Sequence, residues 1–294
     1  MERILLTGAN GQLGTDLRRT LPAAALIPLT RADLDITDPE AVERVLGTHA
    51  PAWVVNTAAY HRVDDIETKD APLAFAVNEV AVGHLARACA QRGARLLHLS
   101  TDYVFGGGFQ GDPPRSYTEE APPAPLSVYG ASKLAGERRV RDASPDHVVV
   151  RSSGLYGVAG SAGKGGNFVE TMLRLAHKGA PIKVVNDQVL GPTYTDDLAE
   201  AIARLIAATP PGGIYHFTNA GACSWFEFAS RIFELCRLTP DLKPTTSNEY
   251  KAPARRPSYS VLANARASAL RLPPLRPWPE ALDAYLRAKK HLAD

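Results

Sequence analysis

The first half of the chain alternates short apolar runs with segments whose apolar residues recur at helical spacing. The runs that we expect to be strands lie at 3–7, 26–29, 53–56, 95–100 and 147–151. The segments that we expect to be helices lie at 12–21, 39–46, 73–92 and 127–141. The strands are continuously apolar, which is typical of strands buried on both faces. This alternation predicts an α/β fold: a Rossmann-like doubly wound parallel sheet with helices on both faces.

The alternation weakens after about residue 152. Further helices are expected at 167–177, 196–208, 225–236 and 279–292. We therefore expect a smaller C-terminal α/β substrate-binding domain over the sheet edge. The expected division gives residues 1–151, with returning segments around 193–214, to the dinucleotide-binding domain, and 152–192 and 215–294 to the smaller one. A loop at 106–126, rich in Gly and Pro, is expected to be a lid or a wall of the substrate site.

Composition narrows the class of protein without changing this fold. Hydrophobic residues make up 45%, charged residues 22%, and the net charge is +2, so no strong field selects nucleic acid or a membrane. No apolar run reaches the ~18 residues that span a bilayer, and the strand-like start does not resemble a cleavable signal, so a cytoplasmic location is expected. Cys89, Cys223 and Cys236 have neither metal spacing nor a disulfide framework, and buried thiols are expected.

Three glycines where the first expected strand meets the first expected helix are the first residues along the chain that indicate a ligand-binding site. Gly8, Gly11 and Gly14 give the pattern G-x-x-G-x-x-G, which differs from the standard G-x-G-x-x-G fingerprint. Glycine lets the chain turn sharply and lets backbone N–H groups approach phosphate oxygens, while the helix N-terminus favours negative charge. A strand-to-helix turn without a ligand is the alternative, but the position favours a dinucleotide pyrophosphate.

The second expected strand bears on the choice of cofactor. An NAD-binding chain usually places an acid at this strand end to hold the ribose diol. Here the strand ends at Arg31, with Asp33 and Asp35 just after it. Arg31 can pair with a 2′-phosphate through charge-assisted hydrogen bonds, which favours NADPH, and NADH stays open.

Far downstream, Tyr129 and Lys133 lie four residues apart and share one face of an expected helix. A phenol has a pKa near ~10, and an ammonium at ~4 Å would favour the phenolate by ~4 kcal/mol at an effective dielectric constant of ~20. Lys133 could also hydrogen-bond the nicotinamide ribose. Thr101, at a strand end, could stabilise charge on a substrate carbonyl, and Asp102 and Tyr103 could hold substrate hydroxyls. These residues predict a ketone reductase.

Together these residues resemble the extended short-chain dehydrogenase/reductase superfamily, and within it the family of dTDP-4-dehydrorhamnose reductases. The resemblance covers essentially the whole chain. Its main motifs are TGANGQLG at 7–14, NTAAY at 56–60, STDYVF at 100–105, YGASK at 129–133 and GPT at 191–193. Dehydratases of the superfamily usually have an acid where Tyr103 stands, so plain reduction is favoured. The resemblance implies NAD(P)H-dependent reduction of the C4 ketone of dTDP-4-dehydro-L-rhamnose to dTDP-L-rhamnose.

The resemblance also implies roles for individual residues. The catalytic set would be Thr101, Tyr129 and Lys133. Contacts with the cofactor are expected from Gly8, Asn10, Gly11, Gln12, Leu13, Arg31, Asp35, Ile36, Ala58, Ala59, Tyr60, Ser100, Tyr129 and Lys133. Contacts with the sugar are expected from Asp102, Tyr103 and Phe105. Some family members dimerise through Mg²⁺, for which Asp16 and Asp196 are weak candidates beside a simpler role as helix-end acids, and a homodimer stays open.

Two other functions stay open. Several family members have a Trp in the wall of the sugar pocket where this chain has Gly154, so a reductase or epimerase of another nucleotide sugar is an alternative. A non-catalytic, dinucleotide-binding regulatory subunit, like the β subunit of methionine adenosyltransferase, is the other. The intact set of Thr101, Tyr129 and Lys133 argues against that subunit, because a pure binding module need not keep all three.

Overall fold

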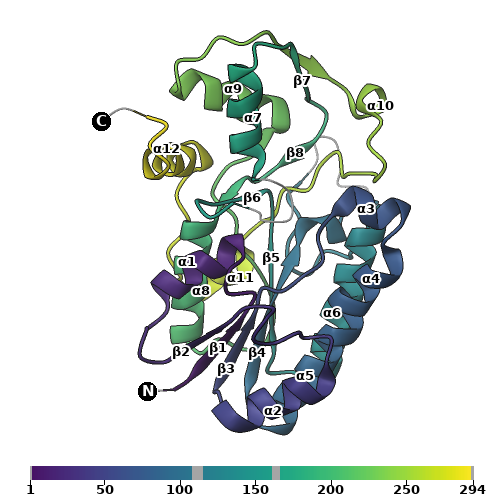
Figure 1. Cartoon of the computed structure of the whole chain (residues 1–294), viewed down its shortest axis with the longest axis vertical. Coiled ribbons are helices and arrows are strands. Elements are labelled where there is room, and N and C mark those ends of the chain that lie inside the picture. The colour runs from purple at the N-terminus through teal and green to yellow at the C-terminus, as the bar shows by residue number, and fades with distance from the viewer. Residues whose placement is uncertain (1, 108–114, 161–165, 293–294) are drawn as a thin grey trace.

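The computed structural model describes residues 2–107, 115–160 and 166–292. Its centre is a six-stranded parallel sheet in the order β10-β5-β4-β3-β1-β2 (Figure 1). The strands are β1 Ile4–Thr7, β2 Leu26–Leu29, β3 Trp53–Asn56, β4 Arg95–Thr101, β5 Val148–Ser152 and β10 Gly213–His216. The chain leaves β1 to one side for β2 and returns to the other side for β3. The carboxyl ends of β1 and β3 therefore flank the switch point, where open α/β sheets bind ligands.

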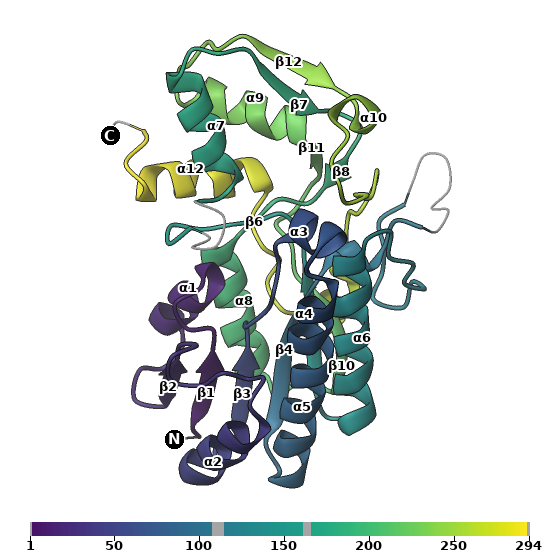
Figure 2. The same cartoon turned by 45° about the vertical axis from the view of Figure 1, so that its right-hand side comes forward.

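Consecutive residues of each central strand pack against opposite faces of the sheet, which explains the continuous apolar runs. Leu6 and Val55 join the core beneath α1 Gln12–Thr20 and α8 Thr195–Ala207. Leu5 and Val54 join the core on the other face, beneath helices that include α2 Pro39–His49, α5 Val82–Gln91 and α6 Val128–Ala143. The predicted doubly wound sheet is confirmed (Figures 1 and 2).

The helix expected at 73–92 begins earlier and changes its winding. It consists of α4 Ala71–Phe75, the π-helix η1 Ala76–Ala81 and α5 in direct succession. Asn78, in the π-helical part, is fully buried, and its amide bonds the backbone of Tyr60 and the hydroxyl of Ser132. π-Helical turns of this kind often occur at functional sites. The short helix α3 Val63–Thr68, which precedes this stretch, was not predicted.

Apart from α8, β10 and α11 Ala265–Ala269, which lie with the central sheet, the helices and longer strands of the second half of the chain form a smaller lobe beyond the carboxyl ends of the strands (Figure 2). Three helices, α7 Phe168–His177, α9 Trp225–Leu235 and α12 Trp278–Ala288, share one apolar core with the parallel pair β7 Ile182–Val185 and β12 Leu242–Thr245. Ser224 and Glu227 form a capping box at the start of α9. The helices agree with the sequence pattern, but the short strands of this lobe were not predicted.

Short elements connect the two parts. Two-residue strands pair as β6 Leu155–Tyr156 with β9 Thr193–Tyr194 and as β8 Val189–Leu190 with β11 Cys223–Ser224. The remaining elements are the 3-10 turn η2 Asp102–Val104 and α10 Ser247–Tyr250.

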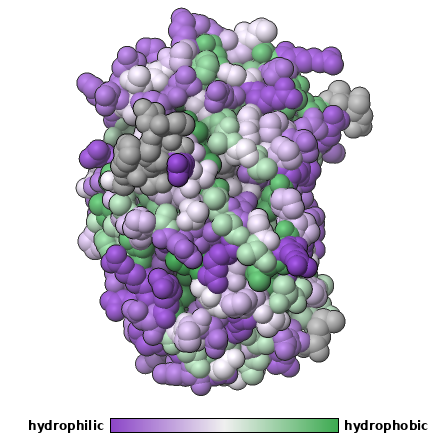
Figure 3. All heavy atoms as spheres, turned by 180° about the vertical axis from the view of Figure 1, so that it is seen from behind, coloured by the Kyte–Doolittle hydropathy of each residue, from purple (hydrophilic) through white to green (hydrophobic). Residues whose placement is uncertain are grey.

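The loop expected at 106–126 lies partly outside the described residues, at 108–114. In its described part, Gly106 bridges to Pro125, and Tyr117 is buried at 2% exposure. Cys89 and Cys223 are buried free thiols, as expected, and Cys236 is a half-buried one. Within the described ranges, no helix combines the length and apolar character that crossing a bilayer requires. Seen from behind, hydrophilic and hydrophobic side chains are interspersed on the surface (Figure 3).

Candidate active site

A cavity of about 1070 Å³ lies where the carboxyl ends of the central strands meet the smaller lobe. The glycine turn after β1, the residues after β3 and the end of β4 all contribute to its wall. The smaller lobe contributes side chains that the sequence pattern did not single out, among them Phe168, Gln188, Trp225 and Arg256. The cavity therefore joins the two parts of the chain, as a site for a cofactor and a second substrate requires.

The glycine turn has the geometry of a phosphate cradle. Gly8 has a φ of +71°, and a Cβ there would come within 2.7 Å of the Thr57 hydroxyl. A Cβ on Gly14 would lie 2.2 Å from the carbonyl oxygen of Gly8, so only glycine fits where α1 starts. No side chain caps α1 and its first turn has no acid. The buried Oε1 of Gln12 has no hydrogen-bond partner among the described residues. These features fit an anionic dinucleotide.

The residues expected at the adenosine end lie along the same cavity. Arg31, Asp35 and Ile36 are in its wall, and the Arg31 guanidinium pairs with Asp35 at 3.2 Å. Hydrogen bonds from the Thr37 hydroxyl and backbone N–H lower the pKa of Asp35. The other expected cofactor contacts that line the cavity are Gly8, Asn10, Gly11, Gln12, Leu13, Ala58, Ala59, Tyr60, Ser100, Tyr129 and Lys133.

Thr101 and Tyr129 meet at the inner end of the cavity. Thr101 ends β4, and Tyr129 lies in the first turn of α6, which Ser127 caps by accepting from the Gly130 N–H. A Cβ on Gly130 would lie 2.2 Å from the carbonyl oxygen of Tyr103, so glycine brings α6 close to the strand end. Burial raises the pKa of Tyr129, and a hydrogen bond with the Thr101 side chain partly opposes that rise. The two side chains that the sequence assigns to one substrate oxygen therefore lie within hydrogen-bonding reach of each other.

Lys133 lies on the same helix but its amine points elsewhere. Nζ is 2.7 Å from the Leu99 carbonyl oxygen and 3.1 Å from Nε2 of His98. Burial lowers the pKa of Lys133 to about 8. In this cofactor-free arrangement burial dominates the pKa of Tyr129 and the amine of Lys133 is engaged with β4, so the expected lowering of the phenol pKa by Lys133 stays a prediction for the cofactor-bound protein.

Asp102 and Phe105 differ from their expected surroundings. Asp102 lines the cavity, but its carboxylate already accepts from Ser153 at 2.9 Å and Ser260 at 2.6 Å, and burial raises its pKa to about 6. Phe105 is not among the residues that line the cavity. The turn after β4 directs its ring into the core, where it stacks on Tyr117 with centroids 4.1 Å apart. Tyr103 does line the cavity, and burial raises its pKa to about 12.

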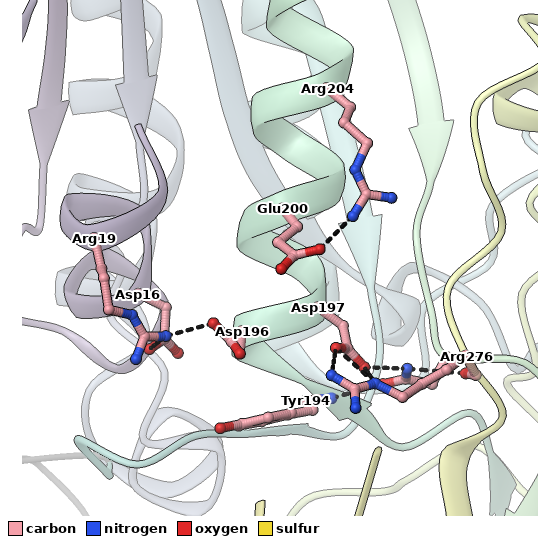
Figure 4. Close-up of polar contacts among 9 residues, drawn as sticks. Asp16, Arg19, Tyr194, Asp196, Asp197, Glu200, Arg204 and Arg276 are labelled. Carbon is pink, nitrogen blue, oxygen red and sulfur yellow. Dashed lines mark hydrogen bonds and ion pairs between the residues drawn. The ribbon is translucent and has the colours of Figure 1, made fainter. Parts of the chain in front are cut away.

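Asp16 and Asp196, the weak magnesium candidates, are not among the residues that line this cavity. Figure 4 shows them on the neighbouring helices α1 and α8. The Asp16 carboxylate accepts from the Thr195 hydroxyl at 2.5 Å, and Arg19 pairs with both acids. In the described part of the chain, no group of three or more His, Cys, Asp or Glu side chains is placed to hold a metal ion. Asp196 lies in the first turn of α8, as expected of a helix-end acid, whereas Asp16 lies in the middle of α1, where its buried carboxylate joins that helix to the start of α8.

A buried polar layer beneath the site was missed by the sequence analysis. The guanidinium of Arg151 bonds both carboxylate oxygens of Glu137, at 2.8 and 2.6 Å, and Glu137 also accepts from Ser100 at 2.5 Å. His98 and Asn56 lie on neighbouring strands and contact each other at 3.1 Å. These side chains are at most 5% exposed. Residue type alone does not distinguish such side chains from solvated ones, but the position of Asn56, Ser100 and Arg151 at or near strand ends was a usable signal.

The fold and the site define a class: a dinucleotide-binding protein of the extended short-chain dehydrogenase/reductase type. Comparison with known proteins identifies the family within this class. Residues 1–291 match the family model described as RmlD substrate binding domain. The chain belongs to this family, that of the dTDP-4-dehydrorhamnose reductases.

Three relatives illustrate the similarity. The dTDP-4-dehydrorhamnose reductase of Streptomyces griseus is 46% identical, over 95% of this chain and 91% of its own. That of Mycobacterium tuberculosis is 44% identical, over 98% and 93%. The crystal structure of the Bacillus anthracis dTDP-4-dehydrorhamnose reductase in complex with NADP superposes with a TM-score of 0.90 at 38% identity, covering 98% of this chain and 99% of that one. The likeness therefore extends over both parts of the chain.

Proposed function

We propose that this protein is an NADPH-dependent oxidoreductase that reduces the C4 ketone of dTDP-4-dehydro-L-rhamnose to dTDP-L-rhamnose. The observation that carries this proposal is the pair of hydroxyls of Thr101 and Tyr129 in the wall of the cavity onto which the glycine turn also opens. The names of the relatives support the substrate, and the Bacillus anthracis complex with NADP supports the cofactor.

The chain's own residues account for binding of the cofactor. The backbone of the turn at Gly8 and Gly11 and the open N-terminus of α1 would hold the pyrophosphate. Arg31 would exchange its exposed pairing with Asp35 for the 2′-phosphate, because that pairing contributes little in solvent. When bound, NADPH supplies the hydride that is transferred to the sugar C4.

Tyr129 would give the proton to the C4 oxygen, and Thr101 would hydrogen-bond the same oxygen as negative charge develops on it. The raised pKa keeps Tyr129 protonated at neutral pH, so the proton is in place before the reaction starts. Lys133, once its amine leaves β4, would favour loss of that proton from the phenol and bond the ribose.

We further propose the division of roles expected from the sequence. Residues 1–151 and 193–214 would bind the dinucleotide, and 152–192 and 215–294 the sugar nucleotide. The presence of Phe168, Trp225 and Arg256 in the cavity wall supports this division, since aromatic rings and a guanidinium suit a base and its phosphates. A cytoplasmic location and a homodimer also stay proposals, to be tested by cell fractionation and light scattering.

The test is to mix protein, NADPH and dTDP-4-dehydro-L-rhamnose and to follow the loss of nicotinamide absorbance. Tyr129→Phe should lower kcat by about 10²–10⁴-fold while NADPH affinity stays within about threefold. Tyr215→Phe is the matched control, because Tyr215 is buried and bonds the Pro211 carbonyl outside the cavity. Absence of turnover by wild-type protein that binds NADPH would reject the substrate. A Tyr129→Phe rate near wild type would reject the role of the phenol.

One observation favours a second candidate, a reductase or epimerase of another nucleotide sugar. Gly154 stands in the cavity wall with a φ of +54°, and a Cβ there would lie 2.7 Å from Cδ1 of Leu190. A tryptophan there would require Leu190 to move and would have a strained φ, so with glycine at this position the sugar meets a different wall. A panel of 4-keto and 4-hydroxy sugar nucleotides separates the candidates: a kcat/KM at least tenfold higher for another sugar would favour the second one.

A further inference from the structure

His98 lies outside every role assigned so far, yet it contacts the amine of Lys133. The imidazole is fully buried, and Lys133 is 2% exposed. Nδ1 of His98 lies 3.1 Å from Nδ2 of Asn56, and Nε2 lies 3.1 Å from Nζ of Lys133. At this direct contact between two buried side chains, the ring nitrogen that carries the proton decides whether the amine is held or repelled.

The backbone fixes the orientation of the Asn56 amide. Its Oδ1 accepts from the N–H of Ala58 at 3.1 Å and from the hydroxyl of Thr7 at 2.6 Å. A flipped amide would place its NH₂ group against the Ala58 N–H, donor against donor, so Nδ2 must face His98. An amide nitrogen can only donate, and Nδ1 of His98 is therefore the acceptor.

It follows that the proton of the neutral imidazole is on Nε2, the atom that faces Lys133. An ammonium has only donors, so a protonated Lys133 would face an N–H with another N–H. An unprotonated amine satisfies every group: it accepts from Nε2–H of His98 and donates to the Leu99 carbonyl oxygen at 2.7 Å. The contact between the two side chains exists only while the amine has lost its proton.

The other ionisable groups near Lys133 set the pH at which its amine loses the proton. Glu137, one turn further along α6, raises the pKa of Lys133, but burial lowers it more, to about 8. That carboxylate is itself held by Arg151, in a pair with both side chains 2% exposed. Tyr129, one turn before Lys133, stays protonated because burial raises its pKa. Burial lowers the pKa of His98, and a charged Lys133 would lower it further, so the imidazole is neutral.

We propose that His98 is a positioning residue that holds Lys133 against β4 in the cofactor-free protein once the amine has lost its proton. Protonation of the amine breaks this contact and frees the side chain for the cavity, where it serves the cofactor and the phenol. The role in the reaction rests on the proposed function, but the contact itself does not. Binding of NADPH should then take up a proton at pH values above about 8, the pKa of the buried amine in the cofactor-free protein.

The contact is tested on cofactor-free protein by two-bond ¹H–¹⁵N NMR of the histidine rings. We expect the Nε2–H tautomer for His98, as for His147, which accepts from the Leu96 N–H through Nδ1 and bonds the Ala86 carbonyl through Nε2. His216 is the opposite reference, because its Nδ1 faces the Tyr117 carbonyl. Lys133→Met should shift the Nε2–H signal of His98 and leave that of His147 in place.

Asn56→Asp gives the sharper comparison, because a carboxylate accepts from the Ala58 N–H and also from a proton on Nδ1 of His98. The variant should move the His98 proton to Nδ1 and turn Nε2 into an acceptor for an ammonium. A wild-type His98 that is charged, or that has the Nδ1–H tautomer, would overturn the proposal. If the Asn56→Asp variant does not fold, the tautomer of His98 in wild type and the shift of its signal in Lys133→Met still decide whether the contact exists as proposed.

The link to the cofactor is tested by the pH dependence of NADPH affinity, measured by fluorescence. In wild type, Kd should rise by up to about tenfold per pH unit above about 8. In the Asn56→Asp variant, the rise in Kd should begin at a pH at least one unit higher than in wild type. A wild-type Kd that does not change in this range would overturn the proposal. Absence of NADPH binding at every pH would instead reject the proposed function. The NMR spectra would still test the contact between His98 and Lys133 in that case.

Discussion

Replacing Arg151 by methionine should destabilise the protein far more than its position, close to the site but outside the cavity wall, suggests. Arg151 is 1% exposed and makes two hydrogen bonds to Glu137, at 2.8 and 2.6 Å, while its guanidinium lies 4.9 Å from the centre of the Phe105 ring. The variant would leave the Glu137 carboxylate buried with only the Ser100 hydroxyl as partner. A buried charge that loses its partner typically costs about 3–5 kcal/mol in the free energy of unfolding.

The assay is urea denaturation followed by circular dichroism, with Arg139→Met as the matched control. Arg139 lies on α6 and pairs with Glu79 at 2.9 Å, but its side chain is 51% exposed. Removal of that exposed pair should cost about 0–1 kcal/mol. The double variant Arg151→Met with Glu137→Met should recover much of the loss, because no unpaired charge remains. An Arg151→Met variant within about 1 kcal/mol of wild type would refute the reasoning.

Two further predictions test the turn and the strand end. Gly14→Ala should weaken NADPH binding by more than tenfold in a fluorescence titration, because its Cβ would lie 2.2 Å from the Gly8 carbonyl oxygen. Gly47→Ala is the control: its Cβ would have no atom within 4 Å, so NADPH binding should not change. Asp102→Asn should remove a pH dependence of the free energy of unfolding. Burial raises the folded-state pKa of Asp102 from 3.8 to about 6, so the folded state binds the proton more tightly than the unfolded state does. The wild-type protein should therefore gain about 3 kcal/mol of stability as the pH falls from above 6 to below 3.8. Urea denaturation at both ends of that range checks it, and equal slopes in variant and wild type would contradict it.

The sequence predicted the sheet well because one physical rule governs its central strands. Each strand is covered on both faces, so Leu5 and Leu6 are both at 0% exposure and the apolar run is continuous. The smaller lobe offers no such rule. Strands such as β6 and β8 are two residues long, and β12 pairs in parallel with a strand about 60 residues earlier in the chain. Pairings of that kind depend on tertiary contacts that no local pattern records.

The same contrast holds in the site. Residues whose chemistry faces the cavity, such as Thr101 and Tyr129, were found because their type and spacing are visible in the sequence. Phe105 was misplaced because the 3-10 turn η2 directs its ring into the core. The amine of Lys133 was expected to lie near the Tyr129 phenol, whereas it lies against β4. Spacing along a helix fixes which face a residue shares but not the direction of a long flexible side chain.

What fixes that direction is the layer of buried polar groups below the cavity. Asn56 is oriented by a backbone N–H, His98 by Asn56, and the amine of Lys133 by His98 and a carbonyl of the same strand. Each member is satisfied by the next, so none is an unpaired buried group, and changing one alters the proton positions of the others. The reactive side chains therefore depend for their charge on residues that never reach the cavity, and substitutions there should change pH dependence before they change affinity at neutral pH.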